Sequence, residues 1–148
     1  MRILLDTNVL IDLYTQREPE GDTAQKLLIM KEFGDAQLWV SAKSFTDVFY
    51  VLSKSYSSKR IQAAFRESLD WLEVCSVDGG DIKLASEREW NDFEDCLVAV
   101  CAEKVKAAFI LTRDERGFKQ CDIPACSPQA FFDMLESERG VVYGLESL

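Results

Sequence analysis

The chain of 148 residues contains no histidine. This absence excludes Ser-His-Asp and Cys-His nucleophile systems and zinc sites that use imidazole ligands. If the chain is an enzyme, carboxylates, lysine or water on a metal must carry its acid–base chemistry. The formal net charge of −9 favours a site built from carboxylates and argues against binding of nucleic acid through bulk positive charge.

Several other common features are missing. No apolar run approaches the roughly 20 residues of a membrane span, and the apolar run after Met1 is too short for a signal peptide. We therefore expect a cytoplasmic protein with no membrane segment. Neither a GxxxxGK[ST] loop nor a GxGxxG motif is present, which argues against a phosphate-cradling nucleotide site.

The chain has an odd number of cysteines, five in total, which favours free thiols. Cys96 and Cys101 would lie about 140° apart on a helix, too far around it to hold one zinc ion together. We interpret most of the cysteines as small, buried apolar residues.

Short apolar runs alternate along the chain with segments of helical periodicity. We expect strands at residues 3–5, 37–41, 73–77 and 107–112 and a short one from residue 123, with helices at about 9–14, 23–33, 44–54, 60–72, 81–89, 92–106 and 129–138. This alternation predicts a single α/β domain over residues 1–139, with a parallel sheet covered by helices on both faces. Residues 140–148 are expected to form a C-terminal tail, either frayed or docked on a partner.

Asp6 follows the first apolar run directly. That run is typical of a strand buried on both faces, so Asp6 should lie at the carboxyl end of a central strand, where open α/β sheets bind ligands. The alternative is that Asp6 only caps the helix that follows.

Three further acids have similar positions. Asp95 shares a helical face with small apolar residues, and Asp114 follows a strand. The alternative for Asp95 is an acid in the first turn of a helix that interacts with the helix dipole, a role that suits Asp92 and Glu94 better. The alternative for Asp114 is a turn residue. Asp47 has the spacing of a capping box with Ser44.

Together, Asp6, Asp47, Asp95 and Asp114 suggest one pocket at the carboxyl edge of the sheet. Two carboxylates about 4 Å apart repel by roughly 4 kcal/mol at an effective dielectric near 20, so such a cluster requires protons or cations. Oxygen ligands without histidine or cysteine select hard cations, which implies Mg²⁺ or Mn²⁺. Carboxylate-bound Mg²⁺ pairs typically serve phosphoryl chemistry.

The chain resembles the PIN domain family in the sequences LLDTNVL at residues 4–10, DFEDCL at 92–97 and LTRD at 111–114, with Phe118 and the helix that starts at Ser127-Pro128. The resemblance implies a three-layer α/β fold with a five-stranded parallel sheet flanked by helices. It also implies metal-dependent endoribonuclease activity. Many members are VapC-type toxins, which implies an RNA substrate, an antitoxin protein and a second copy of the chain as partners.

By position, the resemblance assigns the family's four catalytic acids to Asp6, Asp47, Asp95 and Asp114, with Asn8 and Thr112 as supporting polar residues. We expect Asp6, Asp95 and Asp114 to be the metal ligands, while Asp47 binds the metal or orients its water. The chain departs from the family at two positions: Asp47 stands where Glu is usual, and Gly117 replaces an acid before Phe118.

Two alternatives to a nuclease follow from the residues. These departures suit a PIN-like module that binds RNA or a protein without cutting. A receiver-type phosphoacceptor domain also gathers acids and Mg²⁺ at a sheet edge, but it needs adjacent acids after the first strand and a late lysine. Five cations are candidates for contacts to an RNA backbone: Lys43, Lys54, Arg113, Arg116 and Lys119.

Overall fold

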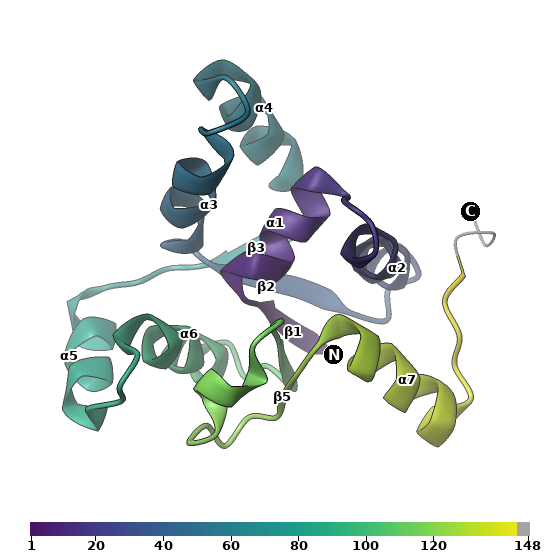
Figure 1. Ribbon diagram of the computed structural model, residues 1–148. Coiled ribbons are helices and arrows are strands. Elements are labelled where there is room, and N and C mark those ends of the chain that lie inside the picture. Colours follow the sequence, from purple (N-terminus) through teal and green to yellow (C-terminus); the bar gives the residue numbers. More distant parts are fainter. Residues whose placement is uncertain (145–148) are drawn as a thin grey trace.

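A computed structural model gives the structure of residues 1–144, and it contains a five-stranded parallel sheet (Figure 1). The strands are β1 (Arg2–Leu5), β2 (Gln37–Ser41), β3 (Leu72–Cys75), β4 (Phe109–Leu111) and β5 (Ala125–Cys126). Their order in the sheet is β3-β2-β1-β4-β5, and each neighbouring pair is parallel. The predicted α/β fold is confirmed, with β1 at its centre.

Helices fill each connection between the first four strands. They are α1 (Thr7–Thr15), α2 (Glu20–Glu32), α3 (Ser44–Leu52), α4 (Ser58–Ser68), α5 (Gly79–Arg88) and α6 (Phe93–Lys104), followed by the 3-10 helix η1 (Glu115–Phe118) and by α7 (Pro128–Arg139). The segment around η1 was expected to be a loop. No helix within residues 1–144 has the length and apolar character that a bilayer crossing requires.

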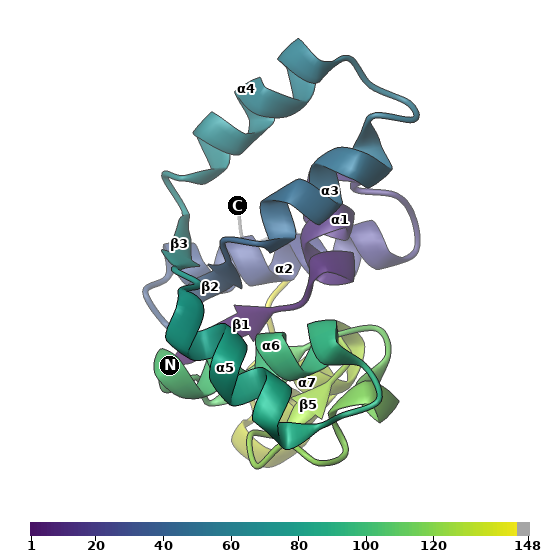
Figure 2. The same cartoon turned by 90° about the vertical axis from the view of Figure 1, so that its left-hand side faces the viewer.

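Alternate residues of β1 face the two sides of the sheet. Ile3 and Leu5 belong to the larger core, which α1, α2, α3 and α7 cover, whereas Leu4 packs with Val98 and Ala102 of α6 on the opposite side. Helix α5 lies outside α6 and packs against it. Figures 1 and 2 show the resulting three layers, with α5 and α6 on one side and α1 to α4 on the other.

The strand order reverses direction at β1. Strands β1, β2 and β3 are laid down in one direction, and β4 then pairs with the other side of β1. The backbone N–H of Asp6 donates to the carbonyl of Leu111 at 2.9 Å, which joins the carboxyl ends of β1 and β4. Open α/β sheets bind ligands at such a switch point. The order also differs from the 2-1-3-4-5 order of receiver-type domains.

The start of the predicted tail packs on its own domain. Gly140 ends α7 in a left-handed conformation, with φ of 63°. Tyr143 is only 8% exposed, its ring packs against Phe132, and its hydroxyl donates to Asp35. The described start of the tail is therefore anchored on the domain through Tyr143. Residues 145–148 of the predicted tail lie outside the described part of the chain.

All five cysteines are unpaired. Cys75, Cys96 and Cys101 are buried, while Cys121 and Cys126 are half-buried. Burial raises the pKa of the Cys101 thiol to about 12, so this residue is neutral at physiological pH. The cysteines therefore act as small core residues, as the sequence suggested.

Candidate active site

Asp6 combines both of the roles that its sequence context suggested. It caps α1, since its Oδ1 accepts a hydrogen bond from the backbone N–H of Thr7 at 2.8 Å. Its Oδ2 accepts one from the hydroxyl of Thr112 at 2.8 Å across the β1–β4 junction. The residue is 6% exposed, and burial raises its pKa despite these hydrogen bonds.

Thr112 is fully buried and joins the two segments that follow β1 and β4. Besides donating to Asp6, its hydroxyl accepts from the backbone N–H of Asp114 at 3.1 Å and from the Asn8 amide at 3.4 Å. The Asn8 carbonyl oxygen in turn accepts from the backbone N–H of Arg113 at 3.1 Å. These bonds use the whole donor and acceptor capacity of the hydroxyl, so the loop after β4 is fixed relative to α1.

The N-terminus of α6 brings three more carboxylates to this place. Asp92 caps the helix by accepting from the backbone N–H of Asp95 at 3.0 Å. Oxygen atoms of Asp92, Glu94 and Asp95 lie within 4.8 Å of one another. Asp6 is not one of these three residues, but its charge raises the pKa of both Glu94 and Asp95.

Glu94 and Asp95 have strongly raised pKa values. Burial is the largest cause in both, and the negative charges of their neighbours add to it. The pKa of Glu94 rises to about 7 and that of Asp95 to about 6. Glu94 was interpreted from the sequence as a first-turn acid, so its place in the cluster was missed. The signal available was its position next to Asp95 at the start of a helix that packs on the sheet.

Asp114 and Asp47 lie farther from the buried acids. The Asp114 side chain is 63% exposed and pairs with Arg116 at 3.2 Å, although its charge still raises the pKa of Asp6 and Asp95. Asp47 forms an ion pair with Lys43 at 2.6 Å, and its charge acts on Glu94. Asp114 and Asp47 therefore act on the inner acids through their charge, while each carboxylate is paired with a neighbouring cation.

The capping box predicted around Asp47 is wrong. Helix α3 begins after Lys43, and no side chain caps its N-terminus. The Ser44 hydroxyl instead accepts a hydrogen bond from the hydroxyl of Thr7 at 3.0 Å. The carboxylate of Asp47 is thereby left free of the helix end and available to Lys43.

Gly117, the second departure from the family pattern, lies directly against Asp95. A Cβ atom at position 117 would collide with Oδ2 of Asp95. The Asp95 carboxylate therefore occupies the space that a larger residue at this position would fill. A side chain at position 117 would therefore require the Asp95 carboxylate to move.

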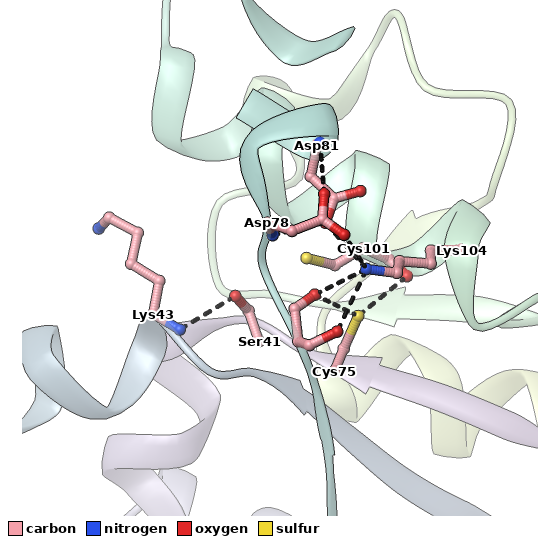
Figure 3. Close-up of polar contacts among 8 residues, drawn as sticks. Ser41, Lys43, Cys75, Asp78, Asp81, Cys101 and Lys104 are labelled. Carbon is pink, nitrogen blue, oxygen red and sulfur yellow. Dashed lines mark hydrogen bonds and ion pairs between the residues drawn. The ribbon is translucent and has the colours of Figure 1, made fainter. Parts of the chain in front are cut away.

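A second group of acids lies at the same edge of the sheet, after β3 (Figure 3). Asp78 and Asp81 form a complete capping box at the start of α5. The ammonium group of Lys104 lies 2.9 Å from Oδ2 of Asp81 and also donates to the Ser76 carbonyl. Hydrogen bonding to Lys104 lowers the pKa of Asp81, opposite to the shifts at Glu94 and Asp95.

Comparison with known proteins identifies the family. The family profile described as "PIN domain" matches residues 2–116, most of the chain. The chain belongs to the PIN domain family. The match runs from β1 through α6 to the start of η1, and so it includes Asp6, Asp92, Glu94, Asp95 and Asp114.

Similar proteins of known name include other PIN-fold chains. Ribonuclease VapC1 of Aquifex aeolicus (strain VF5) is 27% identical over 138 residues, a match that covers 88% of this chain and 92% of that protein. The solved structure of VapBC-1 from nontypeable Haemophilus influenzae matches with a TM-score of 0.66 and 17% identity, over 87% of this chain and 99% of that one. VapC20 of Mycobacterium tuberculosis, described as a sarcin-ricin loop cleaving toxin, matches with a TM-score of 0.63 and 17% identity, over 78% of this chain and 92% of that one.

The acids of this PIN domain fit a hard divalent cation. The donor set around Asp6, Glu94 and Asp95 consists of carboxylate oxygens, which Mg²⁺ and Mn²⁺ prefer. The positive charge of Lys43 acts on Glu94, but the Lys43 ammonium group is paired with Asp47. Carboxylates held together with raised pKa values gain from any positive charge placed among them.

Proposed function

We propose that this PIN domain is a Mg²⁺- or Mn²⁺-dependent endoribonuclease that hydrolyses RNA phosphodiesters and is the toxin of a toxin–antitoxin pair. The observation that carries the proposal is the group formed by Asp92, Glu94 and Asp95, whose oxygen atoms lie within 4.8 Å of one another, together with Asp6 at the switch point of the sheet, whose charge acts on Glu94 and Asp95. Family membership and the ribonuclease name of the Aquifex relative support RNA as the substrate.

In this proposal Asp6, Asp95 and Asp114 hold the cation, as the sequence suggested, and Glu94 joins them. When bound, the cation supplies positive charge that offsets charge developing on the phosphate and lowers the pKa of a nearby water. Asp47, with its partner Lys43, stands at the rim and orients water or substrate.

The supporting residues fix the orientation of the Asp6 carboxylate. The hydrogen bond from Thr112 holds Oδ2 of Asp6, and the bond from the Thr7 backbone holds Oδ1. Asn8 acts through Thr112 and the backbone of Arg113. Because these contacts hold Asp6 before any ligand binds, little reorganisation is required when the substrate arrives.

The proposed partners follow from the named relatives. The VapBC structures support an antitoxin protein as the inhibitor of this chain, and a second copy of the chain is the further partner that we expect. An RNA-cleaving toxin acts where its substrate is, so we expect the protein to work in the cytoplasm.

An RNA cleavage assay on the purified protein tests the proposal. Cleavage should require Mg²⁺ or Mn²⁺ and stop in a chelator, and it should be lost in Asp6→Asn and Asp95→Asn. Asp70→Asn is the matched control, because this exposed acid lies just before the amino end of β3, whereas the site lies at the carboxyl ends of the strands. Cleavage that persists in the chelator or in both site variants would reject the mechanism. Metal binding by the wild type without any cleavage would favour a module that binds RNA or protein but does not cut.

A further inference from the structure

Arg113 is held at both its backbone and its side chain, immediately beside the acidic site. Its backbone N–H donates to the Asn8 side chain at 3.1 Å. Its Nε lies 3.3 Å from Oδ2 of Asp12, in an ion pair where the Asp12 side chain is 10% exposed and that of Arg113 is 46% exposed. The guanidinium group is therefore anchored on a buried acid at one edge and open to solvent elsewhere.

Asp12 has no other evident role in its helix. It lies in the middle of α1, where an acid neither caps the helix nor interacts favourably with its dipole. Burial disfavours its charge, and the opposite charge of Arg113 offsets that cost. A buried carboxylate at this position therefore makes sense as the group that holds the Arg113 guanidinium in one place.

Arg113 also lies where three adjoining grooves meet. The first, of about 480 Å³, includes Pro19, Ser127 and Gln129 in its lining. The second, of about 430 Å³, shares Ser127 and runs past Asp114 to Arg116. The third, of about 390 Å³, extends along α1 and α3. The groove that passes Asp114 therefore also contains the Arg113 side chain.

We propose that Arg113 binds a backbone phosphate of the RNA next to the scissile bond, and that Asp12 is the positioning residue that orients its guanidinium group. This inference rests on the proposed function. A phosphate that approaches the carboxylates around Asp6 is repelled, so the substrate needs a fixed positive charge beside them. The planar guanidinium fork matches phosphate in two hydrogen bonds at once.

Three of the other four candidate cations are less suited to this role. Lys43 is paired with Asp47 at 2.6 Å. The Arg116 side chain is 81% exposed and pairs with Asp114. The ammonium group of Lys54 lies over the ring of Tyr50, 5.1 Å from its centroid. Arg113 contacts Asp12 through Nε and its side chain is 46% exposed, so its two terminal nitrogens are the donors that we expect to reach a phosphate.

RNA binding in the absence of divalent metal tests the inference without requiring cleavage. The probe is a short, labelled single-stranded RNA of mixed sequence, titrated in chelator over a range of KCl concentrations with anisotropy as the readout. Arg113→Met should weaken binding about tenfold. It should also reduce the magnitude of the slope of log K against log [salt] by about 0.7, the value for one phosphate contact on a single strand. Arg139→Met, which removes one charge at the exposed end of α7, should leave both quantities unchanged.

Two further variants separate binding from folding. Asp12→Asn keeps the arginine, so the salt slope should stay at the wild-type value while binding weakens about threefold through the lost orientation. The double variant with Asp12→Asn and Arg113→Met removes the cation without leaving a buried charge, and it should bind like Arg113→Met. Wild-type binding and slope in the double variant, or no RNA binding by the wild type at low salt, would overturn the inference. If wild-type RNA cleavage requires metal while all variants bind RNA as the wild type does, the nuclease proposal is retained and the proposed role of Arg113 is rejected.

Discussion

Two groups of carboxylates lie at the same edge of the sheet, and pKa values in the two groups are shifted in opposite directions. After β3, Asp78 and Asp81 share Lys104, whose ammonium group lies 2.9 Å from Asp81 and lowers the pKa of that residue (Figure 3). After β1, Asp6 meets the acids at the start of α6, where pKa values are raised instead.

The difference separates an acid group that stabilises the fold from one that awaits a ligand. The group at Asp81 is complete in itself, since its capping box is closed and its charge is balanced by Lys104. In the group at Asp6, burial and the charge of Asp6 raise the pKa of both Glu94 and Asp95, while Lys43 is bound to Asp47. A buried charge without a partner destabilises a protein, and such destabilised groups gather at functional sites.

The largest difference between the two groups should appear in the RNA cleavage rate when one carboxylate of each group is replaced. Glu94→Gln should reduce the cleavage rate about 100-fold, the upper end of the effect of removing a group that supports a metal site. Asp81→Asn should leave the rate unchanged, because its carboxylate faces Lys104. The measurement is the initial rate in saturating Mn²⁺. Equal losses in both variants would remove the distinction between the two groups.

A smaller contrast is expected from two glycines, one beside each group. In Gly117→Ala the new methyl group must displace the Asp95 carboxylate, so cleavage should fall about tenfold. Gly79→Ala is the control, because a Cβ atom at that position meets nothing within 4 Å. Cleavage rates and melting temperatures of both variants should be measured together. A normal rate in Gly117→Ala would mean that the observed position of Asp95 is unimportant for catalysis.

In chelator, neutralising one acid of each group should shift stability in opposite directions. At about pH 8, Asp95→Asn should raise the melting temperature by a few degrees because it removes a half-buried negative charge that lies among other carboxylates. Asp81→Asn should lower it by a few degrees because it removes the partner of Lys104. Differential scanning fluorimetry is sufficient, and shifts of the same sign would contradict the comparison.

The smallest expected effect is a pH dependence of the metal-free protein. In the folded state the pKa of Asp95 is about 6 and that of Glu94 about 7, against ordinary values of 3.8 and 4.5. Between the ordinary and the raised values, the folded state holds protons that the unfolded state has released. Stability from these groups is therefore present below about pH 4 and is lost as the pH rises to about 7. Urea unfolding across this range should show a decline in wild type that is reduced in Glu94→Gln.

The fold was predictable because its signals are local. Short apolar runs such as residues 3–5 alternate with amphipathic segments, and parallel strands place their carboxyl ends at one edge. Asp6 and Asp114 were therefore correctly placed at strand ends, and Asp95 was correctly placed against the sheet by the small residues on its helical face.

The inner arrangement of the site was not predictable in the same way. Glu94 and Asp95 are adjacent, and a helical wheel separates them by about 100° without saying how the N-terminus of α6 meets the sheet edge. The capping-box spacing of Ser44 and Asp47 concealed the ion pair with Lys43, which depends on where α3 begins. The effect of Gly117 on Asp95 is a contact between separate elements, which only the three-dimensional structure reveals.

The central claim is that the carboxylates around Asp6 form a site for a divalent cation, whereas those around Asp81 do not. The most direct test is the melting temperature of wild type, Asp95→Asn and Asp81→Asn during titration with MnCl₂ at about pH 8. Since a ligand that binds only the folded state raises its stability with concentration, wild type and Asp81→Asn should both gain melting temperature. Asp95→Asn should show little or no gain. A wild type that does not respond, or an equal response in all three proteins, would contradict the account.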